Sequence, residues 1–257
     1  MEDPVPSKKT PVVSQQTTDR RTWLEWVGKA AVLSLGTAAL ASCFPDAEGF
    51  QGGDGGEGDG GSGGGDGAFQ PGSEDHSVYR GWGERTVDRQ DLESILGSWQ
   101  LTLDGMVEEP RRFTFADLLS LQRQEQVTDF HCVEGWSIQD VPWNGVHLNT
   151  LLPLARPRGG ATHITFHTIH GAYNESLPLP VALEPRTLLA YGIAGSTLPL
   201  KHGFPLRLVV PRLLAYKSAK YVERLELTDH PVEGYWVARG YDYDAEVPAS
   251  RLRPGKY

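Results

Sequence analysis

The sequence predicts an α+β domain built from mixed β-sheets with short helices and long loops. Segments 99–103 and 221–227 alternate apolar and polar residues, as half-buried strands do, and Asp104-Gly105 is expected to turn the first. Segment 206–210 is a short, mostly apolar strand that Pro211 closes. Helix signals are few and short, and the sequence contains no internal repeat.

Three further elements complete this expectation. Segment 162–168 is rich in β-branched and aromatic residues, which favours a strand. Thr114 followed by Asp117 resembles a capping box, with Asp in place of the usual Glu, and predicts a short helix. Residues 149–155 are expected to form a brief helix that Pro153 breaks.

Charge and cysteine content exclude two classes of protein. The chain has 257 residues, a formal net charge of -9 and a pI of about 5.4. Nucleic-acid binders normally carry a basic face, so no nucleic-acid partner is expected. The cysteines are Cys43 and Cys132. With one thiol in the folded part, a disulfide-stapled scaffold is excluded.

The N-terminal region has the order of an export signal. Arg20 and Arg21 resemble a twin-arginine motif and precede the apolar stretch 26–40, which is too short for a confident membrane span. Leu40-Ala41-Ser42-Cys43 then resembles a bacterial lipobox, in which Cys43 would be lipidated. The alternative is a short buried helix with an incidental cysteine.

The domain organisation follows from this order. We expect a twin-arginine-type lipoprotein signal over 1–43, a Gly-rich linker over 44–74 and one domain over 75–257. Glycine dominates 49–67, a composition that buries no apolar surface and suits a flexible tether. We therefore expect the protein to lie on the periplasmic side of a membrane, where the N-terminal lipid anchors it.

The segment Phe130-His131-Cys132-Val133-Glu134-Gly135-Trp136-Ser137 is the first candidate site. A thiolate is a soft, strongly donating ligand that suits a metal with several oxidation states. Read from the residue alone, a lone cysteine such as Cys132 is more often a small buried hydrophobe. Gly135-Trp136-Ser137 lacks the second glycine of a nucleophile elbow, so a serine hydrolase is not expected.

A cluster of basic residues is the second candidate site. It consists of His202, Arg207, Arg212, Lys217 and Lys220. Arginine supplies a two-pronged fork of donors and lysine a point charge, which together suit a phosphate group. The alternative is a solvated basic edge, although Arg207 lies within an apolar strand, where an unpaired charge is costly.

Three histidines form the third pattern, which allows a weaker hypothesis. On a helix His163, His167 and His170 would share a face and suggest a zinc enzyme. The residues between them favour a strand, in which only His163 and His167 share a face.

Five segments, taken in order and spacing, resemble the sulfite-oxidase family of molybdopterin enzymes. They are 103–107, 130–137, 142–146, 202–208 and 216–221. The resemblance covers most of 99–229 and implies a single sulfite-oxidase-type molybdopterin-binding domain. The form Cys-Val-Glu-x-Trp-Ser is most similar to that of periplasmic methionine sulfoxide reductases.

The resemblance also implies the roles of individual residues. Cys132 would be the thiolate ligand to molybdenum, and Glu134 would lie near the metal as a second catalytic residue. The residues implied to bind the molybdenum–molybdopterin cofactor are Thr168, His202, Arg207, Lys217, Ser218 and Lys220.

The implied activity is oxygen-atom transfer to or from a small molecule, with a membrane haem subunit as the implied electron partner. Glu134 near the metal would repel a dianion, so reduction of a neutral S-oxide or N-oxide is favoured over sulfite oxidation. A lipid-tethered binding protein that has lost the cofactor is the non-enzymatic alternative.

Two segments depart from the family pattern. Arg212-Leu213-Leu214-Ala215 stands where the family has Gly-x-Tyr-Gly, and no N-terminal cofactor-contacting segment is clear, although Tyr79-Arg80-Gly81-Trp82 is a candidate. The length leaves no room for a haem domain or a dimerisation domain.

Overall fold

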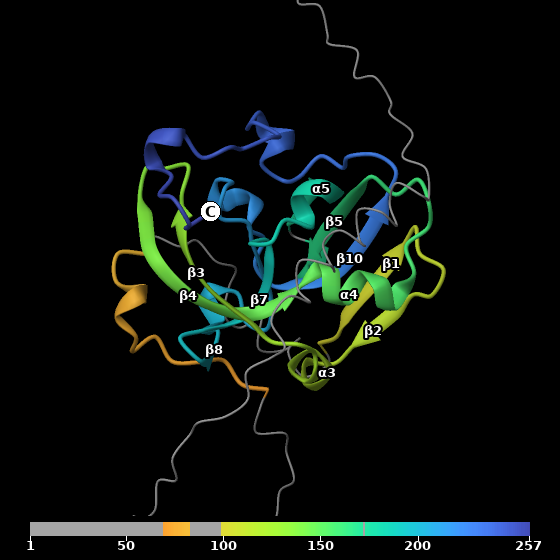
Figure 1. Cartoon of the computed structure of the whole chain (residues 1–257), viewed down its shortest axis with the longest axis horizontal. Coiled ribbons are helices and arrows are strands. Elements are labelled where there is room, and N and C mark those ends of the chain that lie inside the picture. Colours follow the sequence, from red (N-terminus) through yellow and green to blue (C-terminus); the bar gives the residue numbers. More distant parts are fainter. Residues whose placement is uncertain (1–68, 83–98, 172) are drawn as a thin grey trace, which may run out of the picture.

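A computed structural model describes residues 69–82, 99–171 and 173–257. The predicted signal, Cys43 and most of the predicted linker lie outside these residues. In the described part, two sheets stand side by side with short helices between and around them (Figure 1). Mixed sheets, short helices and long loops confirm the predicted α+β class.

Along the described part of the chain, three pairs of strands are each followed by one short α-helix, and four strands come after the last of these helices. The bounds of the strands and helices are β1 (Leu101–Gly105), β2 (Arg111–Phe113), α3 (Phe115–Ser120), β3 (Gln124–His131), β4 (Ser137–His147), α4 (Leu148–Ala155), β5 (His163–Thr168), β6 (Asn174–Pro178), α5 (Leu179–Ala182), β7 (Leu188–Ile193), β8 (Ser196–Thr197), β9 (Arg207–Val209) and β10 (Val222–Thr228). The 3-10 turns are η1 (Ser77–Tyr79), η2 (Ile169–Gly171), η3 (Leu200–His202), η4 (Ala215–Lys217), η5 (Val237–Arg239) and η6 (Ala249–Arg251).

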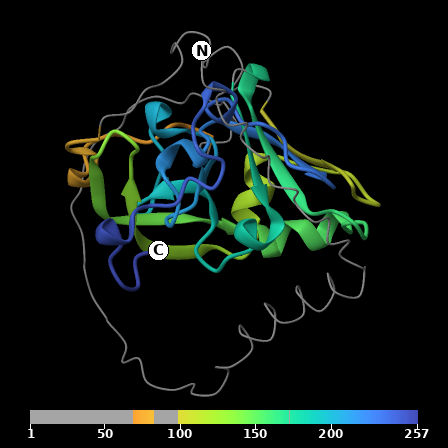
Figure 2. The ribbon, with the colours of Figure 1, turned by 90° about the horizontal axis from the view of Figure 1, so that it is seen from above.

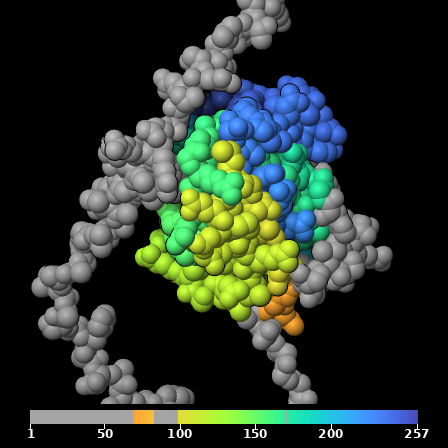
Figure 3. All heavy atoms as spheres, turned by 90° about the vertical axis from the view of Figure 1, so that its right-hand side faces the viewer, coloured from red at the N-terminus to blue at the C-terminus, as the bar shows by residue number. Residues whose placement is uncertain are grey.

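The first sheet has the strand order β2-β1-β10-β5-β6. Strands β1 and β10 pair in parallel, and the other pairs are antiparallel. This sheet joins segments from both ends of the domain, because β1 begins at Leu101 and β10 ends at Thr228. The space-filling view from the side of β1 and β2 shows their yellow segment across the middle of that face (Figure 3).

The second sheet has the order β3-β4-β7-β8. Strand β8 pairs with the last residues of β7, and β9 pairs with the first residues of β7. Strand β7 is buried along its whole length. Gly145 of β4 lies so close to β7 that a Cβ there would be 2.1 Å from the carbonyl oxygen of Leu189. Only glycine fits this crossing.

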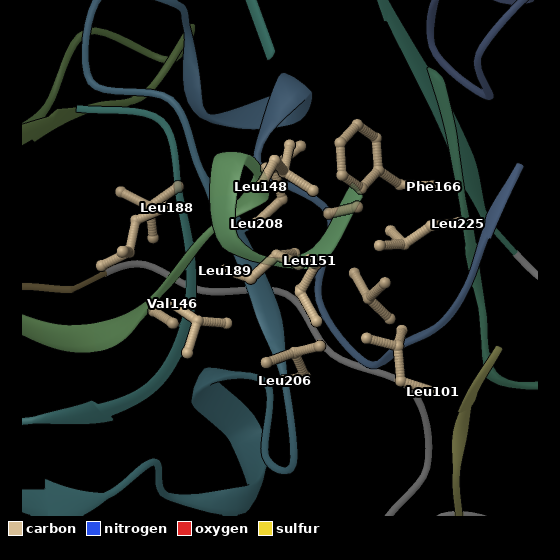
Figure 4. Close-up of a cluster of buried hydrophobic side chains, with 14 of the residues drawn as sticks. Leu101, Val146, Leu148, Leu151, Phe166, Leu188, Leu189, Leu206, Leu208 and Leu225 are labelled. Carbon is tan, nitrogen blue, oxygen red and sulfur yellow. The ribbon is translucent and has the colours of Figure 1, made fainter. Parts of the chain in front are cut away.

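Helix α4 fills the space between the sheets. Figure 4 shows Leu148 and Leu151 of this helix with Phe166 and Leu225 of the first sheet on one side and Leu188 of the second sheet on the other. All five side chains are fully or almost fully buried. This shared core makes the two sheets one domain.

Most of the predicted elements are confirmed, with two corrections. The capping box of α3 forms as predicted, because Asp117 N–H donates to the Thr114 hydroxyl at 3.1 Å and Thr114 N–H donates to the Asp117 carboxylate at 2.8 Å. Pro153 does not break α4, which continues to Ala155; burial of four of its side chains offsets the hydrogen bond that proline lacks. Gly105 ends β1, so the chain turns after Gly105.

The segment 69–82 lies beside the second sheet in both ribbon views (Figure 2). Gly72 N–H donates to the Leu198 carbonyl at 2.9 Å, and Phe69 packs against Phe204 with ring centroids 5.2 Å apart. Residues 69–74, assigned to the linker by the sequence, therefore contact the domain. No helix in the described ranges is long and apolar enough to span a membrane.

Candidate functional site

Cys132 lies in the tight connection between β3 and β4, which we call the Cys132 hairpin (residues 130–137). Cys132 N–H donates to the Trp136 carbonyl at 2.9 Å, and Gly135 N–H donates to the Cys132 carbonyl at 3.2 Å. Gly135 has a φ of 99°, a conformation that glycine adopts without strain. The hairpin presents Cys132 at partial exposure, away from the hydrophobic core.

Glu134, which the family resemblance implies to lie near the metal, is two residues after Cys132. Its carboxylate lies 4.0 Å from the Cys132 sulfur and accepts a hydrogen bond from the Trp136 indole at 3.3 Å. Burial raises the pKa of the Cys132 thiol, the backbone N–H groups of Glu134 and Val133 partly oppose this rise, and the Glu134 charge adds to it. A metal ion at this position would remove the thiol proton, since thiolate is the ligating form.

Arg207 is the centre of the second candidate site and is only 2% exposed on β9. Its guanidinium donates to the His202 carbonyl at 2.9 Å and to the Ser218 carbonyl at 3.3 Å. Burial lowers the pKa of Arg207 to about 10. Its Nε–H has no hydrogen-bond partner among the described residues.

This arrangement fits a cofactor that carries a phosphate group. A buried guanidinium that donates to the neutral carbonyl oxygens of His202 and Ser218 favours a bound anion, because an unbalanced buried charge is costly. Gly203, with a φ of 110°, allows close packing here, since a Cβ would lie 3.1 Å from side-chain atoms of Arg207 and Lys220. The predicted ligands therefore have the chemistry that a pterin phosphate requires.

Aromatic rings connect the two candidate sites. The Arg207 guanidinium lies 4.9 Å from the centroid of Phe130 and 5.3 Å from that of Trp143. Phe130 is two residues before Cys132 on the same hairpin, so the predicted metal ligand and the predicted phosphate ligand share a neighbour. The structure therefore brings together segments that are some seventy residues apart in the sequence.

The segment Tyr79-Arg80-Gly81-Trp82 also joins this site. The rings of Tyr79 and Trp82 lie 4.5 Å and 4.9 Å from that of His202, which is 1% exposed. The sequence offered this segment as the N-terminal contact without assigning its residues. The signal that identifies them is their contact with His202, which only the fold reveals.

The residues 217–220 divide into two groups. Lys220 pairs with Arg207 through an isolated β-bridge, and the Ser218 hydroxyl accepts from Val210 N–H at 3.1 Å, so both lie beside β9. Lys217 is fully buried and its ammonium group donates to Glu175, also fully buried, at 2.7 Å. The charge of Lys217 is therefore paired with the carboxylate of Glu175 inside the protein.

Thr168 lies at the end of β5 and is almost fully buried. Its hydroxyl donates to the Tyr173 carbonyl at 2.8 Å and accepts from the Tyr173 N–H at 3.2 Å. These bonds close the loop that leads to β6. The predicted cofactor contact of Thr168 therefore stays a prediction, while its role in the loop is visible.

The three histidines lie on and after β5, as the strand interpretation predicts. His167 contacts Glu226 at 2.8 Å, and His163 contacts the Thr162 hydroxyl at 2.8 Å. Within residues 69–82, 99–171 and 173–257, no group of three or more His, Cys, Asp or Glu side chains is placed to hold a metal.

The C-terminal residues form a part of the site that the sequence did not reveal. Arg251 donates to the carbonyls of Cys132 and Trp136, at 3.0 Å and 2.7 Å. Arg253 donates to the buried Asp129 at 2.6 Å. A basic run close to the C-terminus was the available signal, but its partners lie more than a hundred residues away in the chain.

Comparisons with known proteins agree with this geometry. A family model described as "Oxidoreductase molybdopterin binding domain" matches residues 87–236. The protein-methionine-sulfoxide reductase catalytic subunit MsrP of Gluconobacter oxydans is 39% identical over 155 residues, which cover 54% of this chain and 49% of that protein. The putative protein-methionine-sulfoxide reductase subunit YedZ1 of Azospira oryzae is 36% identical over 156 residues, 61% of this chain and 59% of that one.

Two further proteins are similar to this chain, one over most of its own length and one over less than half of it. The uncharacterized oxidoreductase YuiH of Bacillus subtilis is 36% identical over 143 residues, which cover 56% of this chain and 72% of that protein. The solved structure of the sulfane dehydrogenase SoxCD from Paracoccus pantotrophus matches with a TM-score of 0.49 and 26% identity, over 59% of this chain and 41% of that one. The chain thus spans about half the length of the Gluconobacter relative.

Proposed function

The chain belongs to the family of oxidoreductase molybdopterin-binding domains, and on that premise we propose that it reduces an S-oxide or N-oxide by oxygen-atom transfer. The observation that supports this most is the shared neighbourhood of Cys132 and Arg207, which Phe130 connects. One residue supplies a thiolate and the other a buried cation. A molybdenum cofactor with a phosphate-bearing pterin requires both.

The proposed roles are those that the family resemblance implies, and the contacts of the side chains support several of them. Cys132 would be the protein ligand to molybdenum, and Arg207 with His202 would hold the pterin and its phosphate. Ser218 and Lys220 lie beside β9, where they would complete the phosphate site, and Thr168 is a further proposed contact. Lys217 would act on the cofactor through the position of its loop, because its ammonium group is bonded to Glu175.

When bound, the molybdenum–molybdopterin cofactor supplies the two-electron chemistry of oxygen-atom transfer. Reduction of an S-oxide then consumes two electrons and two protons and yields a thioether and water. Glu134 is exposed and lies 4.0 Å from the Cys132 sulfur, which supports a role in passing a proton from solvent to the oxygen that leaves as water.

Glu134 also supports a neutral substrate. A carboxylate beside the reaction centre repels sulfite, which is an anion at neutral pH and a dianion at higher pH. The relatives named as methionine-sulfoxide reductases favour the same direction. Sulfite oxidation is the second candidate activity, and a cofactor-free, lipid-tethered binding protein is the third.

The N-terminal region supports a proposed location on the periplasmic side of a membrane. Export through the twin-arginine route would deliver the protein folded with its cofactor, and lipidated Cys43 would anchor it. A membrane haem subunit is the proposed electron donor, to which a tethered domain could dock. Cys43→Ser is expected to move the protein from the membrane fraction to the soluble periplasmic fraction.

A pair of assays on the full chain, made in a host that assembles the cofactor, tests the activity. With reduced viologen and methionine sulfoxide, we expect turnover that Cys132→Ser abolishes. With sulfite and an electron acceptor, we expect little turnover, and Glu134→Gln should raise it because the repulsion is removed. Turnover with sulfite alone would overturn the proposed direction, and absence of molybdenum would favour the binding protein.

A further inference from the structure

The last residues of the chain run along the hairpin that carries Cys132. We call residues 248–256 the C-terminal strap. Figure 1 shows this dark blue segment beside the ends of β3 and β4, and Figure 2 shows the same proximity from above. The strap lies outside residues 87–236, the part that matches the family model.

Ion pairs fix the strap to the base of the Cys132 hairpin. Arg253 binds the carboxylate of Asp129 on β3 and lies 3.0 Å from that of Asp140 on β4. Lys256 binds the other oxygen of Asp140 at 2.6 Å, and its carbonyl accepts from Asp129 N–H at 3.1 Å. The strap therefore contacts both strands of the hairpin at once.

Arg251 extends this attachment to the tip. Its guanidinium donates to the Cys132 carbonyl at 3.0 Å, to the Trp136 carbonyl at 2.7 Å and to the Ser137 hydroxyl at 2.9 Å. These acceptors belong to the first and last residues of the turn. A planar guanidinium with several fixed donors holds such a set in one geometry, which the single ammonium group of lysine does not.

We propose that Arg251 is a positioning residue, which fixes the backbone of Cys132 and thereby the direction in which its sulfur meets the metal. The proposal rests on the proposed function, since it treats Cys132 as the metal ligand. It adds a residue from outside the matched family segment to the structure that orients this ligand. Within the hairpin, Cys132 N–H donates to the Trp136 carbonyl and Gly135 N–H donates to the Cys132 carbonyl, and Arg251 adds a second donor to the Cys132 carbonyl from outside the hairpin.

The first test measures the backbone directly. Amide hydrogen exchange over the peptide 130–137 is compared in wild type, Arg251→Ala and Arg251→Lys, each as the purified full chain. We expect about tenfold faster exchange of the turn amides in Arg251→Ala, because charge-assisted hydrogen bonds are lost, and an intermediate rate in Arg251→Lys. Added guanidinium ion should slow exchange in Arg251→Ala again.

Arg239→Ala is the matched control, because Arg239 is an exposed arginine of the same C-terminal region. It donates to the Tyr235 carbonyl at 2.7 Å and stacks on the Tyr235 ring, so its contacts stay within its own turn. We expect unchanged exchange over 130–137 in this variant. Equal acceleration in both variants would mean general loosening and would overturn the proposal.

The second readout is the electron paramagnetic resonance spectrum of half-reduced, molybdenum-loaded protein. We expect Arg251→Ala to keep its molybdenum, to lower kcat with little change in KM, and to shift or broaden the signal. A wild-type signal together with wild-type exchange would overturn the positioning role. Wild type without molybdenum would instead refute the proposed function, while the exchange comparison would still report on the hairpin.

Discussion

At the scale of single residues, the buried side chains of Arg207 and Lys217 have different kinds of partner. Arg207 contacts carbonyl oxygens and aromatic rings, whereas Lys217 is paired with a carboxylate inside the protein. Sequence reasoning treated both as phosphate ligands because they belong to one basic cluster. The difference depends on Glu175, which lies 42 residues from Lys217 in the chain and carries no local signal.

Substitution of Arg207 tests the cofactor site. Arg207→Lys keeps a positive charge but loses the fork, and we expect the molybdenum retained after gel filtration to fall about tenfold, the cost of one charge-assisted hydrogen bond or more. Arg112→Lys, on an exposed position of β2, is the matched control and should retain the wild-type amount. Full retention in Arg207→Lys would mean that the cofactor does not depend on this fork.

Substitution of Lys217 tests the buried ion pair. Lys217→Met leaves the carboxylate of Glu175 without its partner, and we expect the free energy of unfolding to fall by about 3–5 kcal/mol. The double variant Lys217→Met/Glu175→Leu should recover much of this loss, since no buried charge then remains. Urea unfolding of wild type, Lys217→Met, Glu175→Leu and the double variant measures the coupling. A loss of under 1 kcal/mol in Lys217→Met would contradict the buried pair.

At the scale of secondary structure, local signals predicted some elements and missed others. The capping box of α3 was readable because Thr114 and Asp117 are three residues apart and act on each other. The hairpin of β3 and β4 was not, because Pro142 and Gly145 lie inside β4 and both strands carry register irregularities. Pairing with β7 stabilises β4 despite these residues.

The attachment of the C-terminal strap should depend on pH. Burial raises the pKa of Asp129. Hydrogen bonds from Arg253 and from the Asp140 amide together lower it by more than burial raises it, so the net pKa lies below the ordinary value of 3.8. Hydrogen bonds from Lys256 and Arg253 likewise lower the pKa of Asp140. A lowered carboxylate pKa stabilises the attachment above the ordinary value, and this contribution disappears as pH falls through the lowered pKa.

We therefore expect the strap to stay attached down to about pH 4 and to detach between about pH 4 and 2. Amide chemical shifts of Lys256 and Tyr257 in a pH titration measure this. Asp129→Asn removes the charge that Arg253 binds, so its shifts should resemble the detached state already at neutral pH. Detachment of the wild-type strap above pH 5 would contradict these ion pairs.

At the scale of the whole molecule, the site exists only because the fold brings distant segments together. Phe130 of the hairpin and Trp82 of segment 69–82 both lie against the guanidinium of Arg207 on β9. The sequence predicted the thiolate and the basic cluster, since each is a local pattern that resembles a known family. It did not predict the contact of Phe130 with Arg207 or the role of Arg251, because contacts between segments so far apart in the chain leave no local pattern.

The central claim is that Cys132 binds the molybdenum of a pterin cofactor. X-ray absorption at the molybdenum edge, on full chain made in a host that loads the cofactor, tests it most directly. We predict about one molybdenum per chain, as a single bound cofactor requires, and a sulfur coordination that falls by one in Cys132→Ser. An absent molybdenum edge, or the same sulfur coordination in wild type and Cys132→Ser, would contradict it.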